Sequence, residues 1–243
     1  MQFITKINSR YYTELADTET KKFLDKLGDK STSPEAYRSV MFKLGVKLGN
    51  SILKSINSQS NVYLACTVED ADFLAKGILT TLEPKVSKLA FACFWNQRFS
   101  PFEINELKVA PILKKYQEPV NNDIVQYLIV IKSIISGACV VRTNLTNLIQ
   151  KIEPEKILIA APVIYKTAEE KLRSEFNKDI YSKFEFFYFA KDSTRDDQGI
   201  VLPGIGGSVY ERLGFEGQDE KNRYIPEIVK SRRHKLVQKI YTG

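Results

Sequence analysis

Short apolar runs alternate along this chain with longer stretches in which apolar residues recur every three or four positions. Nearly continuous apolar runs predict buried strands, and the helical spacing predicts helices that bury one face. The expected strands are residues 62–66, 89–95, 124–131, 157–161 and 184–190, with Pro162 ending the fourth, and the expected intervening helices are residues 69–82, 141–151 and 167–176. This alternation predicts an α/β fold with a doubly wound, mostly parallel sheet.

A long amphipathic helix is expected over residues 34–56, ahead of the first of these strands. Either Thr32 or Ser33 can cap its N-terminus, and Pro34 suits its first turn. Before it, residues 1–31 are expected to form a mixed lead-in with short helical segments.

The positive charge of the chain is concentrated at its C-terminal end. Residues 221–243 hold seven basic residues and one acidic residue, which is +6 of the net charge of +7. Apolar residues at helical spacing in this tail predict a helix that docks on the body with a basic outer face. Arg232, Arg233, Lys235 and Lys239 are therefore candidates to contact nucleic acid or an acidic protein partner; the alternative is an ordinary solvated docking helix.

The residue composition disfavours several chemistries. His234 is the only histidine, which argues against Ser-His and Cys-His nucleophiles, and no cluster of metal ligands is visible. Cys66, Cys93 and Cys139 lie in apolar runs without CxxC spacing, which predicts buried thiols in a reducing compartment, the cytoplasm. No run approaches the roughly 18 consecutive apolar residues of a membrane span, so no membrane association is expected.

Two segments carry motifs of a known family. Residues 27–38 read LGDKSTSPEAYR, and residues 199–206 read GIVLPGIG inside a segment that runs from Asp192 to Leu213. Both resemble motifs of the uracil phosphoribosyltransferase family, and Ala160-Ala161-Pro162 stands between them where the family has a similar run.

This resemblance covers about residues 22–215 and implies a type I phosphoribosyltransferase fold. It predicts one domain over residues 1–215, in which residues 192–215 form a hood over the site. Residues 216–243 lie beyond the resemblance and are expected to be a basic helical appendage. Family members commonly self-associate, so a homodimer is also implied.

The resemblance implies a nucleobase site in the hood, held largely through main-chain groups. The matching positions are Ile200, Val201, Pro203, Gly204 and Gly206. Glycines let a backbone approach a flat base closely. Gly207 departs from the family, which commonly has Asp or Asn there. Asp192 and Asp197 are candidates for catalytic roles only if transferase activity survives.

The phosphate-donor side departs further from the family. Where the family has an acidic, glycine-rich phosphate loop, this chain has a degenerate loop with Lys132, Ser133, Ser136 and Gly137. No acid is present in it, so the family's contacts to a sugar diphosphate are not expected to form. Lys132 with the two serines could still form a different anion site.

Single residues elsewhere also depart from the family's contacts to the phosphate donor. Ala65 and Asn96 stand where the resemblance implies arginines, and Glu69 and Asp70 add negative charge beside the donor position. Arg98 lies two residues beyond Asn96 and is a candidate to replace the lost cation.

The leading expectation is a catalytically inactive, phosphoribosyltransferase-like component with a binding, regulatory or assembly role, and with no cofactor. Its ligand would be a nucleobase or nucleotide, and by family-level analogy its setting would be a bacterial defence or retron-like cassette. The first alternative is an active, diverged uracil phosphoribosyltransferase that makes a nucleoside monophosphate, and only then would Mg²⁺ be needed. The second is a nucleic-acid-associated subunit that acts through the basic tail.

Overall fold

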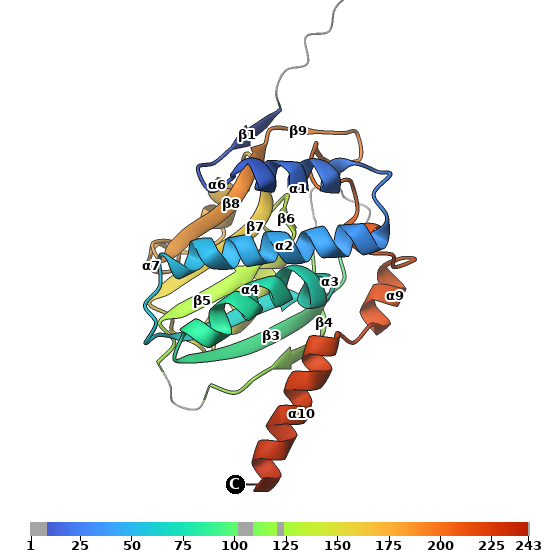
Figure 1. The fold of residues 1–243 in the computed structure, drawn as a ribbon. Helices are drawn as coiled ribbons and strands as arrows, with labels where there is room; N and C mark the ends of the chain where they lie inside the picture. The colour runs from blue at the N-terminus through green and yellow to red at the C-terminus, as the bar shows by residue number, and fades with distance from the viewer. Residues whose placement is uncertain (1–8, 102–108, 121–123, 243) are drawn as a thin grey trace, which may run out of the picture.

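The computed structural model describes residues 9–101, 109–120 and 124–242, with side chains up to Gln238. The strands of its main sheet are β1 (Arg10–Tyr12), β2 (Asn61–Thr67), β3 (Lys88–Asn96), β4 (Ile112–Gln117), β5 (Tyr127–Ile131), β6 (Ile134–Ile135), β7 (Lys156–Tyr165) and β8 (Phe184–Asp192). In the described residues their order is β1-β8-β7-β5-β2-β3-β4, with β6 also paired to β7 (Figure 1). The inner strands are parallel and the edge strands β1 and β4 antiparallel, so the predicted mostly parallel sheet is confirmed.

Helices cover both faces of this sheet, which makes it doubly wound. One face carries α1 (Thr18–Gly28), α2 (Pro34–Leu53), α3 (Val68–Asp70) and α4 (Lys76–Leu82), and the other carries α5 (Cys139–Ile149), α6 (Ala168–Ser174) and α7 (Lys178–Tyr181). Successive β2 residues alternate between the two cores: Leu64 packs on the α2 side and Tyr63 on the α5 side. Ser33, one of the two predicted caps, accepts a hydrogen bond from the amide of Ala36 at the start of α2.

The sequence predicted that Pro162 would end a strand, but Pro162 lies inside β7. Ile131 of β5 lies opposite Ala160 of β7, and Ile134 of β6 lies opposite Val163 of β7. Proline has no amide hydrogen to donate, and Pro162 falls in the gap where β5 has ended and β6 has not begun. The missing donor therefore breaks no ladder bond.

The structure differs from the sequence prediction at two further places. β4 was not predicted because it is an edge strand. Its exposed lysines, Lys114 and Lys115, interrupt the apolar run by which a buried strand is predicted. The lead-in contains β1 as well as α1, and β1 pairs with β8 so that Arg10 lies opposite Asp192.

A hood and a C-terminal segment complete the molecule. The hood contains the small two-stranded sheet of β9 (Thr194–Arg195) and β10 (Val201–Leu202), followed by α8 (Val209–Arg212). Residues 216–242, here called the C-terminal arm, hold α9 (Gln218–Arg223) and α10 (Glu227–Thr242). The far end of α10 projects from the body (Figure 1).

The C-terminal arm is bound to the body near the start of α10. The indole nitrogen of Trp95 donates to the carbonyl of Tyr224 over 2.8 Å, and the hydroxyl of Tyr224 donates to Asp72. Asp72 also accepts from the amides of Glu227 and Ile228 at 2.8 and 2.9 Å. A carboxylate from the body thus caps α10, as side chains do at helix N-termini. None of the described helices is long and apolar enough to cross a bilayer.

Candidate functional site

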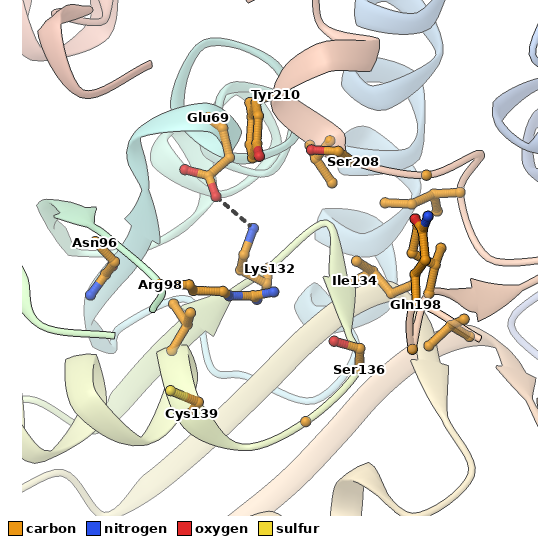
Figure 2. A pocket seen from close by; sticks show the side chains of 18 of the residues that line it. Glu69, Asn96, Arg98, Lys132, Ile134, Ser136, Cys139, Gln198, Ser208 and Tyr210 are labelled. Carbon is orange, nitrogen blue, oxygen red and sulfur yellow. Dashed lines mark ion pairs between the residues drawn. The ribbon is translucent and has the colours of Figure 1, made fainter. Parts of the chain in front are cut away.

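A cavity of about 380 Å³ lies at the carboxyl ends of β2, β3 and β5, beneath the hood. Open α/β sheets bind ligands at this end of their strands, and the volume lies in the range of roughly 300–1,000 Å³ typical of small-molecule sites. Its polar wall is formed by Glu69, Asn96, Arg98, Lys132, Ser136, Arg195, Gln198, Ser208, Gln218 and Lys221. Its apolar wall is formed by Ile134, Ile200, Val201, Ile205, Val209 and Tyr210. Figure 2 shows residues of both walls facing the same space.

Lys132 is the centre of a buried ion cluster at the floor of the cavity. Its ammonium lies 2.8 Å from Asp70 and 3.2 Å from Glu69, and it contacts the hydroxyl of Ser133 at 3.2 Å (Figure 2). Asp70 and Ser133 accept hydrogen bonds from this ammonium, and Glu69 adds an ion pair. Asp70 is held further by the hydroxyl of Thr67 at 2.6 Å and the amide of Ser133 at 3.2 Å. Lys132 is therefore committed to the protein rather than to a ligand.

Glu69 is ionised within this cluster. Burial would raise the pKa of its carboxyl, but the charges of Lys132 and Lys221 lower that pKa to about 2. Its second oxygen, Oε2, is buried and accepts no hydrogen bond from the described residues. The cavity wall thus contains one permanent negative charge, already paired on its other oxygen.

Lys221 brings a second buried cation to the cavity from α9. Its ammonium donates to the carbonyl of Asn96 over 2.7 Å, and the residue is 4% exposed. Burial lowers the pKa of this ammonium, and the charges of Lys132 and Arg98 act in the same direction against that of Glu69. This ammonium also lies 5.8 Å from the centroid of the Tyr210 ring, and two of its three hydrogens have no hydrogen-bond acceptor among the described residues.

Asn96 and Arg98 lie at the end of β3. The amide of Asn96 donates to Asn144 on α5 and to the carbonyl of Ala110, and Asn144 donates back to Asn96 at 3.0 Å. This reciprocal pair fixes the side chain at the position where the resemblance implies an arginine. Arg98, by contrast, is exposed, lines the cavity beside Lys132 (Figure 2), and makes no hydrogen bond or ion pair with the described residues.

The degenerate loop is split between the cluster and the cavity. Lys132, Ser136 and Gly137 line the cavity, whereas Ser133 is fully buried in the ion cluster. The loop leads into the first turn of α5, where Cys139 and Val140 also face the cavity and Ala138 provides no capping side chain. A helix N-terminus of this kind attracts anions. Cys66 and Cys93 are buried as predicted, but Cys139 is only half-buried.

The predicted base-binding residues are also divided. Ile200 and Val201 line the cavity, whereas Pro203, Gly204 and Gly206 do not. The amide of Gly204 donates to Asp192 at 2.8 Å, and its carbonyl accepts from Arg10 at 2.6 Å, so both of its main-chain groups have partners inside the protein. A Cβ added to Gly206 would lie 2.3 Å from the carbonyl oxygen of Leu27, so this glycine permits the hood to pack on α1.

Neither candidate catalytic aspartate lines the cavity. Asp192 is buried and accepts two bonds of 2.7 Å from the guanidinium of Arg10, in addition to the amide of Gly204. It holds the hood against β1. Asp197 is exposed in the turn between β9 and β10.

The predicted basic face of the tail is corrected at Arg232. Its guanidinium binds both carboxylate oxygens of Glu118 at 2.7 and 2.9 Å, pairs with Glu83, and lies over the ring of Phe91. Arg232 therefore docks α10 instead of facing a partner. Arg233 and Lys235 are exposed, and the side chain of Lys239 lies outside the described residues.

Lys221 is a site residue that the sequence did not predict. Its position along the chain indicated a tail separate from the site, whereas α9 places this lysine beside a strand end 125 residues earlier. No local pattern distinguishes it from the other basic residues of the tail.

Neither a protein-family model nor a curated protein matches this chain. Among solved structures, protein AQ2163 from Aquifex aeolicus matches with a TM-score of 0.63 at 18% identity, over 83% of this chain and 97% of that one. Adenine phosphoribosyl transferase from Trypanosoma brucei, in complex with AMP, pyrophosphate and ribose-5-phosphate, matches with a TM-score of 0.47 at 12% identity, over 96% and 100%. A hypoxanthine phosphoribosyltransferase from Staphylococcus aureus matches at 0.40 and 14%, over 70% and 88%. At these identities the matches concern the fold alone, and membership of the uracil-specific family stays a prediction.

Proposed function

We propose that this protein is a phosphoribosyltransferase-like binding protein that holds a nucleotide in the cavity and does not transfer phosphoribose. The observation that carries the proposal is the charge of the cavity wall. Within the described residues, four cationic side chains line it, against the single carboxylate of Glu69: Arg98, Lys132, Arg195 and Lys221. An excess of positive charge along the wall of a cavity favours an anionic ligand.

The two walls suit the two ends of a nucleotide. Ile200, Val201 and Tyr210 offer apolar surface and one aromatic ring to a flat base. Arg98, Lys221 and the first turn of α5 offer charge and helix-dipole stabilisation to phosphate. A phosphate without a base would leave the apolar wall unused.

The ion cluster supports binding without transfer. By the resemblance, acids after this strand would hold the ribose of a sugar diphosphate, but Lys132 and Ser133 stand there. Lys132 is itself bound by Asp70 and Glu69, which leaves neither carboxylate without a cation. Self-association, and a nucleic-acid or acidic protein partner at Arg233 and Lys235, remain further proposals without a contact to support them.

Binding and turnover measured together test the proposal. Calorimetry with nucleoside mono-, di- and triphosphates of the four common bases should give saturable binding, and thermal unfolding should shift upward with ligand. The same protein, given phosphoribosyl pyrophosphate, Mg²⁺ and each base, should release no pyrophosphate. Release of pyrophosphate would establish the active transferase instead, and failure of all nucleotides to bind would reject the proposal.

A matched pair of hood variants locates the base. Ile200→Glu puts a carboxylate on the apolar wall and should weaken nucleotide binding by about 10-fold or more, because a charge replaces apolar contact. Leu202→Glu introduces the same charge two residues along the hood. Leu202 is exposed and does not line the cavity, so this variant should leave affinity within about twofold. Equal effects of the two variants would place the base elsewhere.

A further inference from the structure

The C-terminal arm supplies part of the cavity wall. Gln218 and Lys221 both lie on α9, and both line the cavity. Lys221 is 4% exposed, and its ammonium donates to the carbonyl of Asn96. The docked arm and a ligand in the cavity would therefore share these side chains.

Lys221 is the contact of the arm that an empty cavity disfavours. Burial lowers the pKa of its ammonium, and the charges of Lys132 and Arg98 oppose that of Glu69. The charged form is therefore less stable in the docked arm than in water. Docking of α9 carries this electrostatic cost, and an anion placed beside Lys221 would offset it.

The body holds the arm through residues that adjoin the cavity in sequence. Trp95, which donates to the arm, precedes the cavity residue Asn96. Asp72, which caps α10, follows the cavity residue Glu69 by three positions. Between these two acids, α3 passes into η1 (Ala71–Ala75), a π-helical turn, which is a rare geometry that is frequent at functional sites. The cavity and the anchors of the arm are thus built on the same two segments.

We propose that an anionic ligand in the cavity controls the docking of the C-terminal arm, so that nucleotide binding stabilises the docked arm and loss of the nucleotide favours its release. The inference rests on the proposed function and adds the regulation of that site. Coupling between two equilibria is reciprocal, so a loosened arm must also weaken the ligand. The coupling requires only negative charge beside Lys221, and it holds for any nucleotide that places a phosphate there.

Amide hydrogen exchange of the wild type tests the coupling directly. The probe is the nucleotide that binds most tightly in the calorimetric comparison of mono-, di- and triphosphates. At saturation it should slow exchange in α9 and α10 by about 5- to 100-fold. Exchange in α6, on the opposite face of the sheet, should be unchanged and serves as the internal reference.

A variant of two anchors outside the cavity tests the reciprocal effect. Asp72→Asn combined with Arg232→Ala weakens the cap of α10 and its ion pair with Glu118. Trp95 is the single tryptophan and is 3% exposed, so its emission should shift to the red as the arm leaves. Nucleotide affinity should fall by about 10-fold or more, and saturating nucleotide should reverse the red shift.

The matched control makes the same two changes at exposed positions. Asp25→Asn combined with Arg233→Ala should keep the emission and the affinity of the wild type. Equal exchange in the arm with and without nucleotide, or wild-type affinity in an anchor variant whose Trp95 is exposed, would overturn the inference while nucleotide binding stands. The exchange measurement decides the question even if the anchor variant does not fold. Absence of all nucleotide binding would reject the proposed function, and this inference with it.

Discussion

Lys221 donates a hydrogen bond of 2.7 Å to the main-chain carbonyl of Asn96, across 125 residues of sequence. The bond fastens α9 to the end of β3 and places an ammonium in the wall of the cavity. At the same strand end, the side chain of Asn96 is fixed by Asn144. The cationic character of this corner therefore comes from the C-terminal arm and from Arg98, and not from the residue at the strand end itself.

Loss of the cation at the centre of the ion cluster should destabilise the protein strongly. Lys132→Met leaves the buried Asp70 and Glu69 without their ion-pair partner, and we expect the free energy of unfolding to fall by about 3–5 kcal/mol. Lys156→Met removes an exposed ion pair with Glu185 and should cost no more than about 1 kcal/mol. Urea denaturation of both variants measures this difference, and a similar small loss in both would show that the cluster is not a stabilising unit.

Glu69 should make stability depend on pH in the acid range. Its pKa is lowered in the folded protein to about 2 from an ordinary value of 4.5, so the ionised form is favoured by folding. The stabilisation is fully present above about pH 4.5 and is lost as the pH falls toward 2, because the unfolded chain then binds the proton first. Glu69→Gln should therefore lose less stability than the wild type between pH 5 and pH 3, within roughly this window.

Parallel acid-denaturation series of the wild type and Glu69→Gln measure that contribution. The comparison removes the shared titration of the other carboxyls, including Asp17, whose pKa is lowered by Lys47 and Thr20. Superimposable pH dependences would show that Glu69 is not held ionised by Lys132 and Lys221.

Arg232 should hold α10 on the body, whereas Arg233 should not. Arg232→Ala removes a bidentate pair with Glu118 and the contact with Phe91, and we expect a loss of about 2–3 kcal/mol with faster proteolysis of the C-terminal arm. Arg233→Ala, on the next position of the same helix and exposed, should change stability by less than about 0.5 kcal/mol. If Arg233→Ala instead lowers a salt-dependent affinity for nucleic acid, the tail has the partner predicted from its charge.

Asp192 should act on the position of the hood and not on chemistry. Asp192→Asn replaces a buried carboxylate that accepts two hydrogen bonds from Arg10. The change should lower the free energy of unfolding by about 3–5 kcal/mol. Asp197→Asn, in the exposed turn of the hood, should leave stability unchanged within about 0.5 kcal/mol. Thermal unfolding measures both, and the opposite order of effects would return Asp197 to consideration as the functional aspartate.

Local pattern was sufficient for the central sheet and the order of its helices. The runs at β2, β3, β5, β7 and β8 are apolar because both of their faces are buried, and that property is visible without knowing their neighbours. The boundaries were less accurate wherever a strand had one exposed side, as in β4, or where a ladder had a gap, as at Pro162. The degenerate loop and the hood were placed by the family resemblance and not by periodicity, and their roles stay predictions.

The composition of the site depended on the tertiary structure. Whether Lys132 serves a ligand or a carboxylate, whether Gly204 offers its main chain to a base or to Arg10, and whether Arg232 faces solvent or Glu118 are decided by partners far away in the chain. Lys221 is the clearest case, since nothing around it in sequence indicates a cavity. Side-chain periodicity reports burial, which is a property of one segment, whereas a hydrogen bond or an ion pair requires two segments whose proximity only the folded topology determines.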